Sequence, residues 1–285
     1  MKTFRWLAGA CAISFLALGA AHSEATPPAE EGKATTTAPD YVPRSGQAGK
    51  DVIWLPTQDR LVERMLEMAK VTKDDKLVDL GSGDGRTVIA AAKRGLHARG
   101  IEYNPDLVTV SQRNAEAAGV ADKARFDRGD IFESDFSEAT VVTLFLLPEL
   151  NLRLRPTLLA MKPGTRVVSN TFTMDDWQPD ETAVVAENCS NFCRAYHWVV
   201  PAKVEGTWRL GDGELKLTQK FQMLEGSLSR AGRQVTITDA KMNGAEISFV
   251  ADGMRYSGTV DGTRISGRSE GNGAAQDWQA TRNAS

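Results

Sequence analysis

Residues 76–92 read Lys76-Leu-Val-Asp79-Leu-Gly81-Ser-Gly83-Asp-Gly85-Arg-Thr-Val-Ile-Ala-Ala-Ala92, and this stretch decides the fold. Its apolar start predicts a short strand buried on both faces, and its alanine-rich end predicts a packed helix. The glycines between them allow positive backbone φ angles and close approach of a ligand, because no Cβ stands in the way. Free N–H groups at the helix start favour a polar or anionic ligand. The stretch therefore predicts a strand, a ligand-binding loop and a helix.

Carboxylates stand where the predicted strands end. Glu102 follows the predicted strand 97–101, about 20 residues beyond the glycine loop, where a nucleoside site needs an acceptor for ribose hydroxyls. Asp130 follows the next predicted strand and is placed to accept from an exocyclic amine, while Ile131 packs on a base. Together with Asp79, these carboxylates indicate a nucleoside site far more strongly than the glycines alone.

With these residues the chain resembles the class I S-adenosylmethionine-dependent methyltransferases. Asp79-x-Gly81-x-Gly83-x-Gly85 is similar to the first motif of that family, Glu102 to its ribose acid and Asp130 to its adenine acid. The resemblance covers about residues 51–200 and implies S-adenosyl-L-methionine as cofactor. The cofactor-binding residues that we predict on this basis are Asp79, Gly81, Ser82, Gly83, Gly85, Glu102, Asn104, Asp130, Ile131 and Thr57.

A narrower resemblance concerns the methyl acceptor. The segments Phe145-Leu-Leu-Pro148 and Met161-Lys-Pro-Gly-Thr-Arg-Val-Val-Ser169 are similar to those of a group that includes the lysine methyltransferases of the ATP synthase c subunit and exported bacterial relatives. This similarity implies a protein lysine amine as acceptor, and a small-molecule acceptor stays open.

Two helix starts belong to the predicted site. Asn104 and Pro105 have the residue types of an N-cap and a first helical position. Thr57 ends the segment Asp51-Val-Ile-Trp-Leu-Pro-Thr57 and precedes an amphipathic helix, so it is a candidate N-cap. The family resemblance implies that this segment lies over the cofactor and that Thr57 also contacts it, with capping alone as the alternative.

The acceptor side is less well defined. Many amine-directed methyltransferases have an acidic or amide residue followed by prolines after the fourth strand, here predicted at 141–147, but this chain has Leu146-Leu-Pro-Glu149. Glu149 is the nearest carboxylate and the candidate catalytic residue; the alternative is a first-turn helix residue that favours the helix dipole. Asp175, Asp176 and Trp177 are candidates for the acceptor entrance, with a plain polar loop as the alternative.

Strands 182–187 and 194–200 predict an antiparallel hairpin after the fifth strand, 166–170. Its loop contains Cys189 and Cys193, and an even pair of cysteines in an exported protein favours a disulfide, with free buried thiols as the alternative. One nearby histidine, His197, does not complete a zinc shell, so no metal site is expected, and His197 is interpreted as a strand side chain.

The N-terminal residues have the pattern of an export signal. Residues 1–25 place Lys2 and Arg5 before an apolar run, which predicts a cleaved signal peptide and a periplasmic location, with an uncleaved membrane anchor as the alternative. Residues 26–50 are rich in Pro, Thr, Ala and Glu and predict a flexible linker. No stable membrane span is expected in the mature chain. A formal net charge of −3 gives no case for nucleic acid as a partner.

The predicted organisation is therefore α/β followed by all-β. Residues 51–201 predict a Rossmann-like doubly wound sheet with the methyltransferase site, and residues 203–285 predict a small antiparallel sandwich or partly closed barrel. Turn dipeptides punctuate the second part, and Trp208 and Trp278 are expected in its core.

The function predicted from these features is methyl transfer to a nucleophilic acceptor. An exported, non-catalytic binding protein on a methyltransferase scaffold is the main alternative. A nicotinamide- or flavin-dependent oxidoreductase is disfavoured, because its usual loop is G-x-G-x-x-G and here Gly85 comes only two positions after Gly83. The sequence leaves the oligomeric state open.

Overall fold

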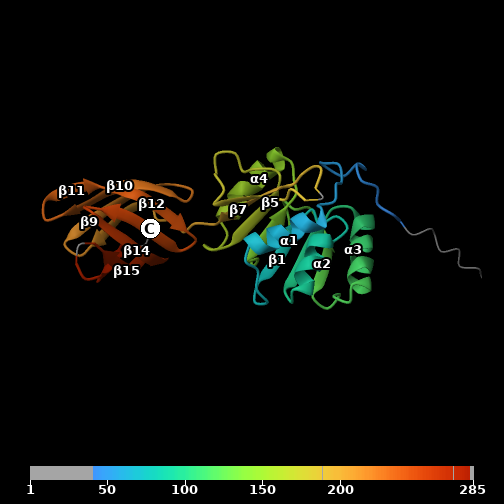
Figure 1. Ribbon diagram of the computed structural model, residues 1–285, viewed down its shortest axis with the longest axis horizontal. Coiled ribbons are helices and arrows are strands. Elements are labelled where there is room, and N and C mark those ends of the chain that lie inside the picture. Colours follow the sequence, from blue (N-terminus) through green and yellow to red (C-terminus); the bar gives the residue numbers. More distant parts are fainter. Residues whose placement is uncertain (1–40, 188, 272, 283–285) are drawn as a thin grey trace, which may run out of the picture. The chain divides into compact units, whose positions relative to one another are not determined.

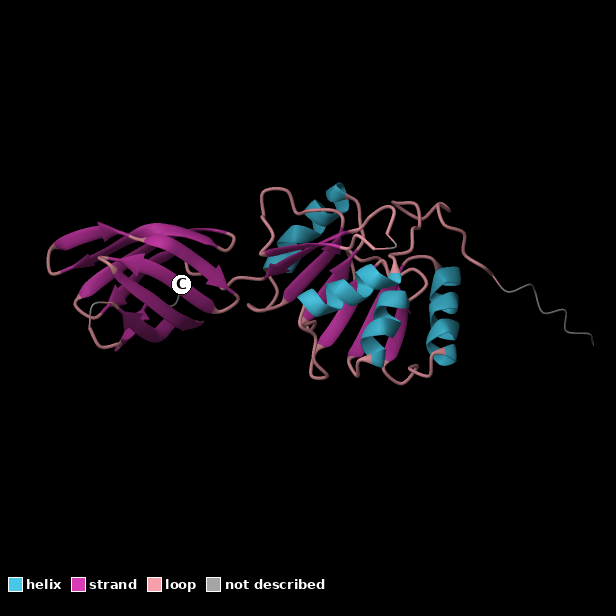
Figure 2. Cartoon of the chain, viewed as in Figure 1, coloured by secondary structure: helices cyan, strands magenta, loops and turns pink. Residues whose placement is uncertain are grey.

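The computed structural model describes residues 41–187, 189–271 and 273–282 (Figure 1). The predicted signal peptide and most of the predicted linker lie outside these residues. The described part of the chain contains a mixed sheet of seven strands followed by an antiparallel sheet of nine (Figure 2). No helix within it is long and apolar enough to cross a membrane.

The first sheet has the strand order β3-β2-β1-β4-β5-β7-β6. Strands β1 to β5 are parallel, and β7 runs antiparallel to both β5 and β6. The predicted Rossmann-like sheet and its antiparallel hairpin are thus confirmed. The strands are β1 (Lys76–Leu80), β2 (His97–Glu102), β3 (Ala124–Arg128), β4 (Val141–Leu144), β5 (Arg166–Asn170), β6 (Glu181–Val184) and β7 (Arg194–Val199).

Helices cover both faces of this sheet. One core joins α1, α2 and α3 to one face, and a second core joins α4 to the other. Strand order reverses between β1 and β4, so the carboxyl ends of these strands form the crevice in which doubly wound folds bind ligands. The helices are α1 (Asp59–Met68), α2 (Arg86–Lys93), α3 (Pro105–Ala117) and α4 (Pro148–Leu159).

Strand β4 is shorter than predicted. The apolar run 141–147 predicted one continuous strand, but β4 ends at Leu144. Leu147 is the N-cap residue of α4 and Pro148 is its first residue, so the chain must leave the sheet before Pro148. The apolar residues after Leu144 therefore line a loop at the crevice.

The hairpin loop contains the predicted disulfide between Cys189 and Cys193, which is confirmed. His197 lies in β7 and is buried, as expected of a strand side chain. Burial lowers the pKa of His197 to about 4, so the imidazole is neutral at ordinary pH.

The second sheet closes into an antiparallel barrel of eight strands. Pairing of β8 with β16 and of β9 with β10 completes the ring, so the barrel is fully closed rather than a sandwich. Strands β11 and β12 continue one another with an interruption at Ile237, which divides the predicted run 234–238. The strands are β8 (Gly206–Leu210), β9 (Gly213–Lys220), β10 (Met223–Arg230), β11 (Arg233–Thr236), β12 (Thr238–Asn243), β13 (Glu246–Ala251), β14 (Met254–Asp261), β15 (Arg264–Glu270) and β16 (Gln276–Thr281).

Aromatic side chains fill the barrel. Trp208 and Trp278 are both buried in its core, as expected. The ring of Trp278 meets Phe249 edge to face at 5.9 Å and Tyr256 at 5.7 Å. These contacts pack the interior with side chains, as in other small barrels.

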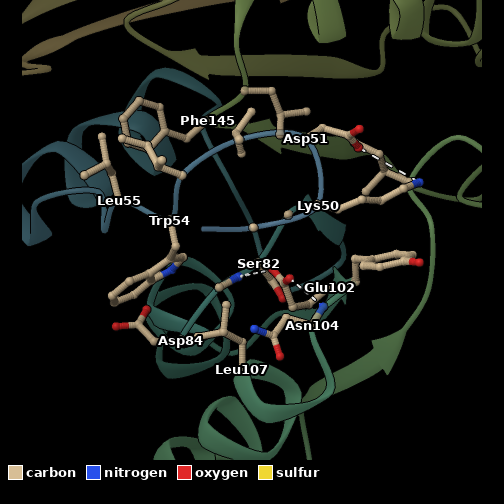
Figure 3. A pocket seen from close by; sticks show the side chains of 18 of the residues that line it. Lys50, Asp51, Trp54, Leu55, Ser82, Asp84, Glu102, Asn104, Leu107 and Phe145 are labelled. Carbon is tan, nitrogen blue, oxygen red and sulfur yellow. Dashed lines mark hydrogen bonds and ion pairs between the residues drawn. The ribbon is translucent and has the colours of Figure 1, made fainter. Parts of the chain in front are cut away.

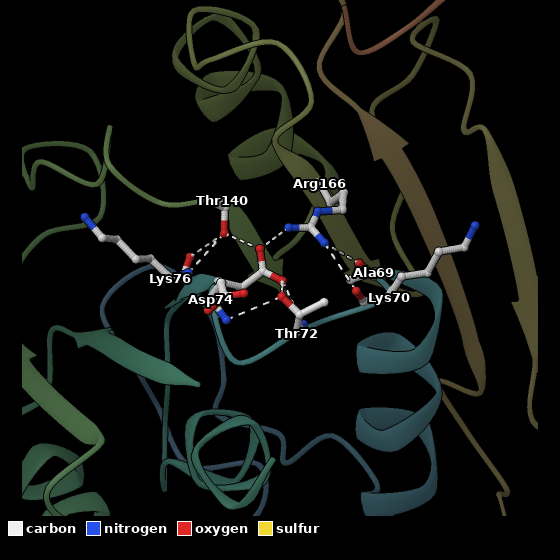
Figure 4. A network of polar contacts seen from close by, with 8 residues as sticks. Ala69, Lys70, Thr72, Asp74, Lys76, Thr140 and Arg166 are labelled. Atoms are coloured by element: carbon white, nitrogen blue, oxygen red, sulfur yellow. Dashed lines mark hydrogen bonds and ion pairs between the residues drawn. The ribbon is translucent and has the colours of Figure 1, made fainter. Parts of the chain in front are cut away.

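One carboxylate ties the first sheet together at its amino-terminal edge (Figure 4). Asp75 accepts hydrogen bonds from Thr140 Oγ1 at 2.7 Å, from the backbone N–H of Thr72 at 2.8 Å and from the Arg166 guanidinium. Arg166 also donates to the carbonyl of Ala69, just beyond α1, at 2.8 Å. Burial opposes the charge of Asp75, but the hydrogen bonds outweigh it and lower its pKa.

Replacing Asp75 should therefore destabilise the whole sheet. Asp75→Ala leaves the Arg166 guanidinium without its carboxylate, and we expect the free energy of unfolding to fall by about 3 kcal/mol. Chemical denaturation followed by circular dichroism measures this change. The neighbouring exposed Asp74→Ala variant is the control and should change stability by less than about 0.5 kcal/mol. Equal effects of the two substitutions would contradict this role of Asp75.

Candidate functional site

A pocket lies at the carboxyl edge of β1, β2, β3 and β4 (Figure 3). The glycine loop forms one side of it, and the segment 48–57 covers it. Figure 3 shows Glu102 beside Asn104 at one end of the pocket and Phe145 beside Leu55 at the other. Of the predicted site residues, those that line the pocket are Thr57, Gly81, Ser82, Gly83, Glu102, Asn104, Asp130 and Ile131.

Glu102 fixes the glycine loop. One carboxylate oxygen accepts from the backbone N–H of Gly83 at 2.9 Å, and the other accepts from the backbone N–H of Asn104 at 2.9 Å. Asn104 in turn caps α3 by accepting from the N–H of Asp106 at 2.9 Å, which confirms the predicted N-cap. One side chain therefore holds the loop and the next helix start in a fixed relation.

Gly83 cannot accept a side chain. Its φ angle is +56°, and a Cβ at this position would stand 2.3 Å from Nε1 of Trp54. The indole thus packs directly on the loop backbone. A larger residue at position 83 would clash with Trp54 and also project into the pocket.

Asp79 and Gly85 do not line the pocket. Asp79 is buried beneath the loop and accepts from Thr143 Oγ1 at 2.6 Å. A Cβ on Gly85 would lie 2.7 Å from both Ser111 and Phe126, so this glycine allows α2 to pack closely. Both residues support the loop from below, whereas the sequence placed them with the residues that contact the cofactor.

Burial raises the pKa of Asp79 to about 7, and the nearby charges of Glu102 and Asp84 add to this shift. The hydrogen bond from Thr143 acts in the opposite direction but does not offset burial. Asp79 is thus close to half-protonated at neutral pH, unlike an ordinary aspartate.

Asp130 faces an ammonium group. The Lys50 Nζ atom lies 2.5 Å from one carboxylate oxygen, and the N–H of Phe132 donates to the other at 2.9 Å. The hydrogen bond from Lys50 lowers the pKa of Asp130. Lys50 also stands 4.7 Å from the centre of the Tyr103 ring. Asp130 is therefore ionised and placed to accept from N–H groups.

The predicted linker is wrong for its last ten residues. Residues 41–50 belong to the folded structure: the N–H of Gly46 donates to the carbonyl of Trp54, and the N–H of Trp54 donates to the carbonyl of Gln47, each at 2.8 Å. These bonds form a small turn that carries Lys50 to Asp130. Composition failed here because backbone hydrogen bonds and the ion pair of Lys50 with Asp130, rather than apolar burial, hold this segment.

Thr57 is not the N-cap of α1. The helix begins at Asp59 after Gln58, and no side chain caps it. Thr57 is buried instead and accepts from Asn170 Nδ2 at 3.2 Å, while its carbonyl accepts from Arg86 at 2.9 Å. These contacts hold Thr57 in the pocket wall, and its contact with the cofactor stays a prediction.

The candidate catalytic residue Glu149 lies outside the pocket. It is exposed in the first turn of α4, which is the structural alternative that the sequence left open. The pocket wall there is apolar and consists of Phe145, Leu146 and Leu150. No residue of this wall offers a side-chain carboxylate.

The predicted acceptor entrance also differs. Trp177 is fully buried against Trp198, and Asp176 pairs with Arg155 at 2.6 Å, so neither lines the pocket. The sequence analysis assigned no role in the pocket to Lys50 or Trp54, and it quoted Phe145 only as part of a segment similar to lysine methyltransferases.

These features together define a class I S-adenosylmethionine-dependent methyltransferase. A doubly wound sheet with an antiparallel β7 presents a glycine loop and the carboxylates of Glu102 and Asp130 at one crevice. The residues present fit S-adenosylmethionine, because Glu102 faces the pocket and Asp130 already accepts from a nitrogen cation. The cofactor supplies a sulfonium methyl group with high intrinsic reactivity.

Comparison with known proteins agrees with this class. Residues 79–181 match the model of the ANTKMT methyltransferase domain. The chain is 46% identical to a protein-lysine N-methyltransferase of Saccharolobus islandicus, over 49% of this chain and 89% of that protein. The chain therefore belongs to the same group of class I S-adenosylmethionine-dependent methyltransferases as this relative. It is 38% identical to the mouse lysine N-methyltransferase of the ATP synthase c subunit over 45% of this chain, and spans about half of that relative (52%).

A solved structure is similar as well. The chain is 49% identical, with a TM-score of 0.50, to a protein titled an RNA methyltransferase of Salinibacter ruber in complex with S-adenosyl-L-homocysteine. The similarity covers 53% of this chain and 96% of that one. S-adenosylmethionine is accordingly the cofactor.

The raised pKa of Asp79 predicts an unusual pH dependence of stability. The folded-state pKa of Asp79, about 7, lies above its unfolded value of 3.8. Protonation of Asp79 therefore contributes its full stabilisation of the fold below pH 3.8, and this stabilisation is lost as the pH rises toward 7. Asp79→Asn cannot ionise. Its free energy of unfolding relative to the parent should therefore increase by about 1 kcal/mol per pH unit between pH 5 and 7, then level off.

Denaturant melts at several pH values measure this difference. The exposed Asp74→Asn variant is the control, and its stability should follow that of the parent at every pH. Parallel curves for Asp79→Asn and the parent would show that Asp79 is ionised throughout.

Proposed function

We propose that this protein transfers methyl groups to lysine side-chain amines of a protein acceptor. The observation that supports it most strongly is the 46% identity to a protein-lysine N-methyltransferase whose length the chain covers almost completely. The mouse relatives named for the c subunit of ATP synthase and for adenine nucleotide translocase are lysine methyltransferases too. Because these relatives are named enzymes, they do not favour a non-catalytic binding protein.

In this proposal different pocket residues bind different parts of S-adenosylmethionine. Glu102 would accept from the ribose hydroxyls while it holds the glycine loop, and Asp130 would accept from the exocyclic amine of adenine. Further contacts would come from the glycine loop and the pocket wall, through Gly81, Ser82, Gly83, Asn104, Ile131 and Thr57. Asp79 and Gly85 would act through the loop, because neither lines the pocket.

The apolar wall at the other end suits an amine acceptor. Leu146 and Leu150 offer little hydration to a charged group, which lowers the pKa of an ammonium that reaches them and favours the neutral amine. The bound cofactor would supply the methyl group and keep the C–S bonding pair on its sulfur, while the acceptor nitrogen would take the methyl group and release its surplus proton to water. The chain contributes position and desolvation rather than a nucleophile of its own.

RNA is the second candidate acceptor, since the similar solved protein is titled an RNA methyltransferase. The composition gives it little support. A formal net charge of −3 does not attract a polyanion, whereas affinity for nucleic acid rests mainly on Lys and Arg contacts to phosphate. The experiment below separates the two acceptors.

We also propose that the protein works outside the cytoplasm, in the periplasm, after cleavage of residues 1–25. The disulfide between Cys189 and Cys193 supports this location, because disulfides persist in oxidising compartments. An uncleaved anchor in the same region would leave the site on the same side of the membrane.

Methyl transfer can be tested directly with labelled cofactor. The purified chain is incubated with methyl-tritiated S-adenosylmethionine and either poly-L-lysine or a mixed-sequence RNA. We expect label in poly-L-lysine and none in RNA. Glu102→Ala should lower kcat/KM by about 10- to 100-fold, because ribose and the loop lose a charged partner.

Glu116→Ala, an exposed carboxylate on α3, is the matched control and should keep the parent rate. Label in RNA alone would replace the lysine acceptor with RNA. No label in either polymer, although the chain binds the cofactor, would exclude both candidates.

A further inference from the structure

Three phenylalanine rings meet at the apolar end of the pocket. The ring centres of Phe145 and Phe192 are 5.4 Å apart, and that of Phe172 lies 6.2 Å from the first and 6.3 Å from the second. Phe145 lines the pocket itself. None of these residues belongs to the buried cores of the described structure, so this aromatic triad is not needed to fill the fold.

The sheet topology brings the triad together. Phe145 follows the end of β4, and Phe172 follows the end of β5. Because β7 is antiparallel to β5, its first residues pair with the last residues of β5, as in Asn170 with Ala195. Phe192 precedes β7 and therefore lies at the same edge. Segments distant in sequence thus gather three rings at this edge of the sheet, and one of them, Phe145, lies in the pocket wall.

The backbone around two of the rings is unusual. Phe192 has a φ angle of +56°, and Thr171, next to Phe172, has a φ angle of +62°. Left-handed conformations are uncommon for bulky or β-branched residues and cluster at functional sites. The short loop closed by Cys189 and Cys193 holds Phe192, which is 40% exposed. The disulfide loop therefore presents an exposed aromatic ring in a backbone conformation that bulky residues seldom adopt.

The triad also has no cation over any of its rings among the described residues. Elsewhere in that part of the chain, Lys50, Arg153, Arg155 and Arg282 stand over the rings of Tyr103, Phe132, Phe221 and Trp208. Within the described residues the triad therefore has no cation partner of its own. Aromatic rings attract ammonium groups, including methylated ones, through their negative faces.

We propose that Phe145, Phe172 and Phe192 form the binding subsite for the alkylammonium group of the acceptor, and that the disulfide loop keeps Phe192 in place. This inference rests on the proposed transfer to lysine. The rings hold the charged side chain as it enters and the methylated ammonium as it leaves. Between these events the ammonium gives a proton to water, and the neutral nitrogen reaches the methyl carbon.

Binding of tetramethylammonium tests the subsite without any methyl transfer. The full chain, saturated with S-adenosyl-L-homocysteine and labelled with ¹³C in its phenylalanine rings, is titrated with tetramethylammonium chloride. We expect saturable shifts of the three rings, and no such shifts with tert-butanol, a neutral molecule of similar size. Phe192→Leu keeps an apolar side chain but removes one ring face, so the dissociation constant should rise about threefold.

Two further variants separate the subsite from general effects. Cys189→Ser combined with Cys193→Ser frees the loop and should weaken tetramethylammonium binding as much as Phe192→Leu does. Phe221→Leu removes a phenylalanine outside the pocket and should bind like the parent. Cofactor affinity should stay unchanged in all of them, which shows that the fold and the cofactor site are intact.

The outcomes distinguish this inference from the proposed function. Saturable binding that Phe192→Leu weakens supports the subsite, even if poly-L-lysine is not methylated. Methylation of poly-L-lysine without tetramethylammonium binding, or with equal binding by Phe192→Leu and the parent, overturns the subsite and leaves the proposed function standing. Equal binding of tert-butanol would also overturn it, because the site would then be merely apolar.

Discussion

The two hydrogen bonds that Glu102 accepts are the constraint on which the site depends. They join the N–H of Gly83 in the glycine loop to the N–H of Asn104 at the start of α3. Parallel register makes this reach possible, since Leu80 pairs with Ile101 and the carboxylate comes one residue later. The loop therefore has its shape before any ligand arrives, and binding does not have to order it.

The rest of the pocket is built around this fixed loop. Trp54 packs on Gly83 from above, and Asp79 supports the strand end from below. Burying the Asp79 carboxyl beside the charges of Glu102 and Asp84 has a cost, which appears as its raised pKa. Asp130 adds another negative charge to the pocket, and the ammonium of Lys50 offsets it. Apolar side chains line the other end, so the pocket has polar groups at one end and a dehydrated wall at the other.

Much of this could be predicted from the sequence, because the deciding signals are local. The glycine spacing and Glu102 predicted the strand, loop and helix, and the turn dipeptides predicted an all-β segment. The failures concern contacts over long sequence distances. Neither the pairing of Lys50 with Asp130 nor the clustering of Phe192 with Phe145 leaves a local pattern. Glu149 was chosen by proximity in sequence, yet the start of α4 turns it to solvent.

Calorimetric titration of the chain with S-adenosylmethionine tests the central claim most directly. The account predicts saturable binding by the parent and none by Gly83→Arg, whose side chain would clash with Trp54 and fill the pocket. Circular dichroism of the variant must show an intact fold for the comparison to hold. Equal affinity of the folded Gly83→Arg variant and the parent, or no heat from the parent at millimolar cofactor, would contradict a cofactor site built on the glycine loop.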